Sequence, residues 1–150
     1  MKEIKVQIKF DGKQWEKTIP EGTTLGEISK EYDTDPKCRI IAAKMEREIE
    51  ELFQPVTKEC TIEFLTGSSL DGYRILERAL SFIFVRAACE VFGRESEVKI
   101  EHSLDKGLYC EIEPQHGTLT KSSVEQVQKV MEKIVEQDDA FEKHTFPLEE

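Results

Sequence analysis

The stretch that decides the fold is residues 4–28, which read IKVQIKFDGKQWEKTIPEGTTLGEI. Apolar and polar residues alternate over residues 4–10, and this period of two is typical of a half-buried β-strand. The dipeptide Asp11-Gly12 favours a tight hairpin turn. We therefore expect residues 13–19 to return as a second strand.

A short helix is expected to follow this hairpin. Pro20 and Gly22 interrupt the strand pattern. Thr24 and Glu27 have the spacing of a capping box, in which each side chain bonds the backbone of the other residue. The helix is expected to continue to about Tyr32, with its apolar residues facing the sheet.

Further strand-like segments complete the first half of the chain, at residues 38–44, 49–52 and 60–64. The predicted order is strand, strand, helix, strand, short strand, strand, which is the order of a ubiquitin-like β-grasp fold. We therefore expect residues 1–66 to form one α+β domain. A polar, glycine-containing linker is predicted at residues 67–72.

The second half predicts another α+β domain. Apolar residues cover much of the circumference of a helix predicted for residues 73–92, so this helix is expected to be largely buried. Strands are predicted at residues 98–102 and 108–112 with a turn at 105–107, and Thr120 is placed to cap a second helix.

The C-terminal residues suggest that this second domain, residues 73–150, is incomplete. The alternation of residues 141–146 predicts a strand, and residues 147–150 resemble the start of another helix. Such elements would belong to a domain that continues beyond residue 150.

Composition and charge exclude several classes of protein. The 150 residues include 21 basic and 31 acidic side chains, a formal charge of −10. This balance argues against strong non-specific binding of nucleic acid, which requires a basic surface. Residues 1–66 hold 11 basic and 14 acidic residues, whereas 67–150 hold 10 and 17. The net charge of the whole chain therefore does not exclude a local basic stripe on the first domain.

The sequence also bears on cellular location. No apolar run approaches the roughly 20 residues that a membrane helix needs, and no signal peptide is visible. Four widely spaced cysteines without a CxxC pair predict free thiols. We therefore expect a cytoplasmic protein in a reducing compartment.

Residues 1–66 resemble a TGS domain, the ubiquitin-like module found at the N-terminus of threonyl-tRNA synthetases and in some GTPases and stringent-response enzymes. The likeness is carried, in this order, by residues 20–25 (PEGTTL), 41–45 (IAAKM), 51–52 (EL) and 60–65 (CTIEFL). The resemblance implies a module that contacts a nucleotide or RNA.

Residues 72–150 resemble the first half of the second N-terminal domain of threonyl-tRNA synthetase, which has editing activity in bacterial enzymes. Residues 107–112 (GLYCEI) stand in place of a Gly-Phe-Tyr-Tyr-Asp-Phe-like strand. Leu119-Thr120 matches the start of the helix that follows. The resemblance implies a partial editing-like domain.

The resemblance breaks at the editing site itself. The family needs a His-x-x-x-His pair at the start of the long helix, and the alignment places Arg74 and Arg78 there. A guanidinium stays protonated and cannot act as a general base, so no catalytic residue is assigned and deacylation is not expected. The two arginines share one helical face. They could bind a phosphate or carboxylate, or pair with Glu77, Glu101 or Glu111 at the surface.

A TGS domain followed by an editing-like domain without these histidines also resembles the N-terminal region of bacterial uridine kinase or phosphoribulokinase-like proteins. In that group a P-loop kinase domain follows, and residues 100–111 (IEHSLDKGLYCE) fit it better than the synthetase. No P-loop motif occurs within residues 1–150. ATP and Mg²⁺ are therefore expected only for a downstream catalytic domain, and no cofactor is expected in this chain.

His102, Tyr109 and Cys110 are further candidates for lining the same cleft. A Cys–His metal site needs three or four ligands. His116 is the only further candidate ligand beside His102 and Cys110, so no metal is expected. A Cys110 nucleophile beside His102 lacks a third group. The remaining interpretations are a half-buried thiol with a strand histidine, or a non-catalytic pocket lined by His102 and Tyr109.

Lys5 and Lys9 lie on one side of the first predicted strand. With Lys13, Lys17 and Arg39 they could form a basic face that contacts RNA. The alternative is an ordinary solvated strand face.

These observations lead to one main hypothesis and two alternatives. The main hypothesis is a non-catalytic, ligand-binding or regulatory N-terminal region of a uridine kinase-like protein, with a nucleotide or RNA as ligand. The first alternative is a TGS and editing fragment of a threonyl-tRNA synthetase that deacylates aminoacyl-tRNA. The second is a protein-interaction module that uses an edge of the β-grasp sheet. Membranes and DNA are not expected partners.

Overall fold

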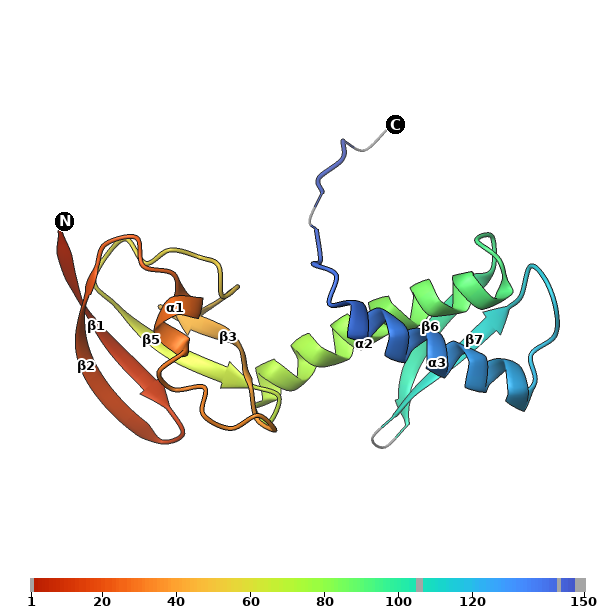
Figure 1. The fold of residues 1–150 in the computed structure, drawn as a ribbon, viewed down its shortest axis with the longest axis horizontal. Coiled ribbons are helices and arrows are strands. Elements are labelled where there is room, and N and C mark those ends of the chain that lie inside the picture. The colour runs from red at the N-terminus through yellow and green to blue at the C-terminus, as the bar shows by residue number, and fades with distance from the viewer. Residues whose placement is uncertain (1, 105–106, 143, 148–150) are drawn as a thin grey trace. The chain divides into compact units, whose positions relative to one another are not determined.

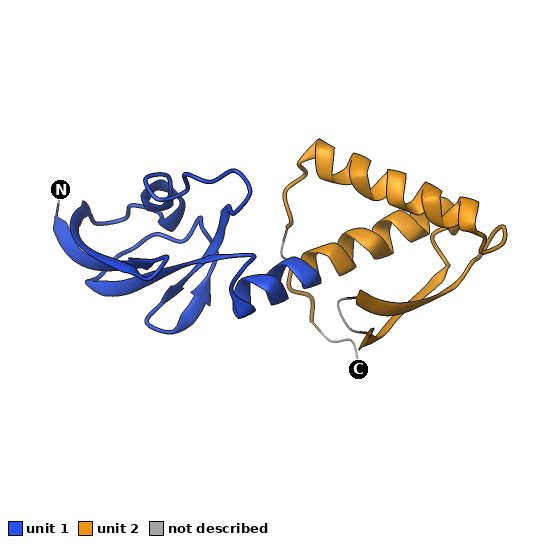
Figure 2. Cartoon of the chain, turned by 90° about the horizontal axis from the view of Figure 1, so that it is seen from below, with its two compact units in different colours: residues 1–78 blue, residues 79–150 orange. Residues whose placement is uncertain are grey.

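The computed structural model describes residues 2–104, 107–142 and 144–147, and it has the predicted α+β composition (Figure 1). The chain divides into two compact units, residues 1–78 and 79–150, each with its own hydrophobic cluster (Figure 2). The boundary between the units falls inside one long helix.

The first unit is a five-stranded mixed sheet with a short helix. The strands stand in the order β2-β1-β5-β3-β4. The central strands β1 and β5 pair in parallel, and every other neighbouring pair is antiparallel. This arrangement is that expected of a β-grasp fold. In chain order the elements are β1 Glu3–Phe10, β2 Lys13–Pro20, α1 Leu25–Ser29, β3 Ile40–Met45, β4 Glu48–Glu50 and β5 Cys60–Thr66.

Helix α1 begins with the predicted capping box. The Glu27 backbone N–H donates to the Thr24 hydroxyl at 3.2 Å, and the Thr24 N–H donates to the Glu27 carboxylate at 2.9 Å. The Glu27 carboxylate accepts hydrogen bonds from the Thr24 backbone N–H and hydroxyl, and these hold the pKa of Glu27 below its usual value. The helix ends at Ser29, earlier than predicted, and Tyr32 packs against Trp15 with ring centroids 5.0 Å apart.

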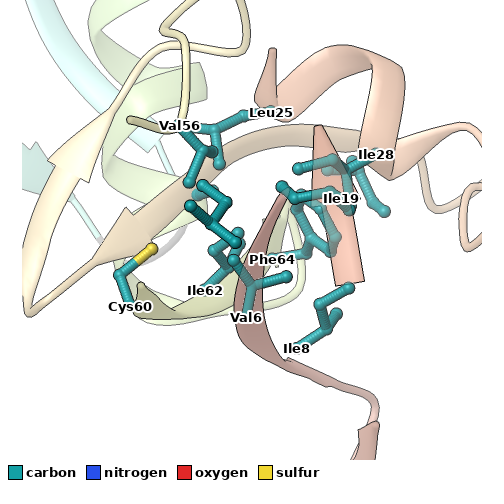
Figure 3. Close-up of a cluster of buried hydrophobic side chains, with 12 residues drawn as sticks. Val6, Ile8, Ile19, Leu25, Ile28, Val56, Cys60, Ile62 and Phe64 are labelled. Atoms are coloured by element: carbon teal, nitrogen blue, oxygen red, sulfur yellow. The ribbon is translucent and has the colours of Figure 1, made fainter. Parts of the chain in front are cut away.

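The core of the first unit lies between one face of the sheet and α1 (Figure 3). Alternate residues of β1 and β5 point into it, as the period of two predicts. Leu25 and Ile28 of α1 cover them, and all these side chains are buried. The labelled members of the cluster are Val6, Ile8, Ile19, Leu25, Ile28, Val56, Cys60, Ile62 and Phe64. The opposite face of the sheet carries polar side chains such as Lys9 and Glu63, together with the buried Ala42 and Leu65.

The second unit is built on a two-stranded hairpin and two helices. Its elements are the part of the long helix α2 Leu70–Phe92 from Ala79 onward, β6 Glu97–Leu104, β7 Gly107–Glu113 and α3 Lys121–Gln137. Thr120 caps α3 as predicted and forms a capping box with Ser123. Helix α2 begins earlier than predicted, so residues 70–72, expected as part of a linker, are helical.

Helix α2 is not largely buried, contrary to the prediction. Its C-terminal half contributes Ala87, Ala88 and Phe92 to the cluster of the second unit. Toward its N-terminus, Tyr73 is 48% exposed, and Leu80 is 52% exposed. The prediction is wrong because α3, β6 and β7 supply packing partners only for the C-terminal half of this helix.

Three predictions concern the ends and turns of the second unit. The predicted strand at 141–146 is wrong for residues 141, 142 and 144–146, which form no strand ladder. Phe141 instead packs edge-on against Phe82, with ring centroids 5.7 Å apart. The predicted turn at 105–107 falls mostly on residues 105–106, and the predicted helix start falls mostly on 148–150. Both of these segments lie outside the described residues.

Candidate functional site

Arg74 and Arg78 lie one turn apart on α2 with exposed side chains. The carboxylate of Asp71 lies 4.0 Å from the Arg74 guanidinium. Asp71 is bonded more closely to Lys44 of β3, at 2.5 Å. This ion pair holds the pKa of Asp71 below its usual value and raises that of Lys44. Arg74 therefore shares a carboxylate that already has a closer partner.

His102 and Tyr109 form a stacked pair on the β6–β7 hairpin, with ring centroids 5.3 Å apart and planes inclined by 26°. A β-bulge explains this contact. Ile100 pairs with Cys110 and Ser103 pairs with Leu108, so two residues of β6 face the single residue Tyr109 of β7.

The bulge separates His102 from Cys110. Paired residues of an antiparallel ladder share a face, so Cys110 lies on the face of Ile100 and Leu108, whereas His102 joins Tyr109 on the other face. The predicted alternation, with His102 on the face of Ile100, is therefore wrong. Burial raises the pKa of the Cys110 thiol. A thiol in such surroundings is a poor nucleophile, and this histidine does not activate it.

The outer face of the hairpin is acidic around the His102–Tyr109 pair. Lys99 bonds Glu97 at 3.1 Å, and Glu113 and Glu111 raise its pKa further. The Tyr109 hydroxyl donates to Glu111 at 3.2 Å, which raises the pKa of the phenol. These carboxylates would repel an anion, so the stacked pair alone does not form an anion site.

The residues predicted to line one cleft fall in two compact units. Arg74 and Arg78 belong to residues 1–78, and His102, Tyr109 and Cys110 belong to 79–150. A cleft shared by all five residues stays a prediction. In the described part of the chain, no group of three or more His, Cys, Asp or Glu side chains could hold a metal ion.

Lys5 and Lys9 lie on the face of the first sheet that is opposite to α1. Lys5 is exposed and lies 4.0 Å from Glu16. The prediction that Lys17 belongs to this face is wrong, because Lys17 pairs with the core residue Val6 and so lies on the face of α1, where it bonds Glu31. Arg39 is paired with Asp33. The broad basic face is thus partly neutralised.

A hollow of about 590 Å³ lies on this face around Lys9. The strand register places Lys9 beside Glu63 of β5, and Glu63 beside Lys44 of β3, so that three charges alternate across neighbouring strands. We call this region the sheet-face hollow. Its lining residues are Lys9, Lys44, Glu46, Arg47, Thr61 and Glu63.

Two cations of the sheet-face hollow, Lys44 and Arg47, were missed by the sequence analysis. Neither lies on the first strand, where the basic pattern was visible. Lys44 reaches the hollow through the β3–β5 register, and Arg47 through the two-residue turn between β3 and β4. A strand-order argument combined with the turn at residues 46–47 could have found them.

A second, mostly apolar hollow of about 590 Å³ lies in the second unit. Phe82, Ile134 and Phe141 contribute to its walls. At its rim, Arg86 bonds Asp139 at 3.4 Å and so holds the chain that leaves α3. No helix in the described residues is long and apolar enough to cross a membrane.

Comparison with known proteins gives one consistent relationship. The chain is 26% identical to the threonine–tRNA ligase of Sulfurihydrogenibium sp. (strain YO3AOP1) over 89% of this chain and 21% of that protein. It is 28% identical to the ligase of Clostridium novyi (strain NT), over 95% and 22%. It is 29% identical to that of Clostridium acetobutylicum, over 97% and 22%. The chain thus spans about a fifth of the length of these relatives.

No family model matches the sequence. Among solved structures, one similar chain belongs to the crystal structure of ATBAG1 in complex with HSP70. That match has 15% identity and a TM-score of 0.36, and it covers 59% of this chain and 55% of the other. Nothing is inferred from so distant a likeness. The relatives instead support the resemblance to the TGS and editing-like region of a threonyl-tRNA synthetase.

Proposed function

We propose that this chain is a tRNA-binding region of the synthetase type, with a TGS module and an editing-like module, and that it does not itself hydrolyse aminoacyl esters. The observation that carries the proposal is similarity to threonine–tRNA ligases over 89–97% of the chain. tRNA is the macromolecule named in those relatives. The sheet-face hollow is the surface to which we assign the RNA backbone.

The geometry favours binding over catalysis. Ester hydrolysis requires a nucleophile or a positioned general base. Cys110 has a raised pKa, and His102 lies on the other face of the hairpin. Arg74 and Arg78 cannot accept a proton at neutral pH. The residues that stand in the editing positions therefore suit anion contact and not proton transfer.

Two assays on the intact chain test this proposal. Fluorescence anisotropy with labelled threonine-specific tRNA should show binding that weakens as salt is raised. Mischarged seryl-tRNA should be hydrolysed no faster with the chain than without it. Accelerated hydrolysis would refute the non-catalytic part of the proposal, and an absence of tRNA binding would overturn the binding role.

A matched pair of variants tests whether tRNA binds at the sheet-face hollow. Lys9→Ala removes a cation of the sheet-face hollow, whereas Lys133→Ala removes an exposed cation of α3. Lys9→Ala should weaken tRNA binding several-fold, and Lys133→Ala should leave it unchanged. Equal effects of the two substitutions would argue for a purely non-specific charge interaction.

The uridine kinase context is a second candidate, and it rests on residues 100–111 alone. That segment forms most of the bulged hairpin. The coding sequence downstream of residue 150 distinguishes the candidates directly. A P-loop motif there would support a nucleoside kinase, with ATP and Mg²⁺ in that domain, whereas class II synthetase motifs would support the ligase. The interaction-module hypothesis stays a prediction for the edge strands β2 and β4.

A further inference from the structure

The turn between β3 and β4 places two residues with side chains in a conformation that favours glycine. Glu46 has φ of 52° and Arg47 has φ of 79°. Met45 pairs with Glu48, so these two residues form the entire hairpin loop. Positive φ at both loop positions corresponds to a type I′ turn, for which Asn-Gly, Asp-Gly and Gly-Gly are preferred. A bulky residue with a β-carbon is strained there.

The same chain builds an equivalent turn without this strain at the second loop position. Phe10 pairs with Lys13, so Asp11 and Gly12 form a two-residue loop between β1 and β2. Their φ values are 50° and 72°, close to those of the other turn. The chain therefore carries the favoured Asp-Gly sequence in one hairpin and Glu-Arg in the other. A strained turn of this kind is kept where a contact offsets the strain or where the conformation serves a function.

Glu46 supplies the contact that holds the strained turn. Its carboxylate accepts a hydrogen bond from the Thr61 backbone N–H at 2.9 Å. Its own backbone N–H donates to the Thr61 carbonyl at 3.3 Å. Glu46 is thus bonded on both sides of one residue of β5, and this fixes the direction in which Arg47 leaves the turn.

Arg47 is the residue that this arrangement presents to the sheet-face hollow. The other charges there have partners. Glu46 bonds Thr61, Lys44 bonds Asp71, and Glu63 stands between two lysines. Among the described residues, no ion pair forms with Arg47 or Lys9. Arg47 and Lys9 are therefore the cations of the hollow that no ion pair within the described residues engages, with Glu63 next to Lys9 on the neighbouring strand and Thr61 in the same lining.

From these observations we propose that Arg47 is an RNA-contacting residue that binds a phosphodiester group in the sheet-face hollow, and that Glu46 is its positioning residue. A guanidinium fork matches two phosphate oxygens and gives charge-assisted hydrogen bonds. Because the backbone of the turn is fixed before RNA arrives, binding at Arg47 requires the ordering of its side chain alone. This inference rests on the proposed RNA-binding function and names a contact within it.

Arg47→Gly is the sharpest test, because it should improve folding while it impairs binding. Glycine adopts the positive φ without strain. The urea midpoint of unfolding should therefore rise. RNA affinity should fall about tenfold, the loss expected for one charge-assisted contact. The slope of log affinity against log salt should become less steep by about 0.7–0.9, the value for one phosphate contact.

Matched variants separate charge, strain and position. Arg47→Ala should weaken RNA binding as much as Arg47→Gly but without the full gain in stability. Lys2→Ala, which removes an exposed cation of the same unit that is paired with Glu21, should leave binding unchanged. Glu46→Ala should weaken binding although Arg47 is intact. Glu46→Gln should restore it, because the amide oxygen can still accept from the Thr61 N–H.

The outcomes distinguish this inference from the function on which it rests. If wild-type protein binds RNA and Arg47→Gly binds it equally well, the role of Arg47 is refuted and the proposed function stands. If the wild type binds no RNA, the proposed function fails and the inference fails with it. If Arg47→Gly lowers the urea midpoint, the strain argument is wrong.

Discussion

The core of the β-grasp unit gives a prediction whose magnitude follows from one buried side chain. Ile62 lies on β5, is fully buried, and belongs to the cluster between the sheet and α1. Replacing a buried isoleucine by alanine costs about 3 kcal/mol, through the lost transfer free energy and the cavity that remains. For a unit of this size the dependence of stability on urea is about 1 kcal/mol per molar. Ile62→Ala should therefore lower the urea midpoint by about 3 M.

Trp15 provides the signal for this measurement. It is the single tryptophan of the chain and packs against Tyr32 in the same unit. Its fluorescence should therefore report the unfolding of residues 1–78. Ile49→Ala on β4 is the matched control, because this isoleucine is 49% exposed and should shift the midpoint by less than about 1 M. Equal shifts for Ile62→Ala and Ile49→Ala would refute the packing described for β5.

Further predictions concern the helix cap, the ion pair and the thiol. Thr24→Ala should destabilise the first unit by about 1 kcal/mol, and Thr24→Ser should restore most of this loss, as measured by urea unfolding. Asp71 has a lowered pKa in the folded state, so its contribution to stability should be present above about pH 4 and lost as the pH falls through the folded pKa. Asp71→Asn should remove this part of the acid dependence, and an unchanged pH profile would argue against the bond to Lys44. Cys110 should react with iodoacetamide more slowly in folded than in urea-unfolded protein, because burial raises its pKa. Mass spectrometry of the alkylated peptide measures this ratio, and equal rates would contradict the burial.

Short-range patterns predicted most elements of the fold. The alternation in β1, the Asp11-Gly12 turn, and the Thr24 and Thr120 caps all depend on residues close together in sequence. The parallel pairing of β1 with β5 agrees with the β-grasp order that was expected. The strand alternation, the turn and the caps could be predicted because local periodicity and capping chemistry decide them, whereas the parallel pairing was expected from the order of the elements.

The errors arise where distant contacts or a ladder irregularity decide the outcome. The bulge in β6 shifts His102 to the face of Tyr109, and alternation alone cannot show an inserted residue. The exposure of Leu80 depends on which elements cover α2. The apolar pattern of the helix does not show which part of it is covered by other helices and strands.

The candidate site was predicted only in part. Lys9 was identified from strand alternation, but its neighbours Lys44 and Arg47 come from β3 and from the turn after it. Their convergence depends on strand order and register, which a single sequence does not display. Whether Arg74 and Arg78 act with His102, Tyr109 and Cys110 stays a prediction.

The most direct test of the account is the salt dependence of tRNA binding by the intact chain. Two cations of the sheet-face hollow, Lys9 and Arg47, form no ion pair among the described residues, so two phosphate contacts predict a slope of log affinity against log salt of about −1.4 to −1.8. Anisotropy titrations from low to physiological salt measure this slope. A slope in that range, made less steep by Lys9→Ala, is the predicted result. A slope near zero, or no binding at low salt, would contradict the assignment of an RNA-binding surface to this sheet.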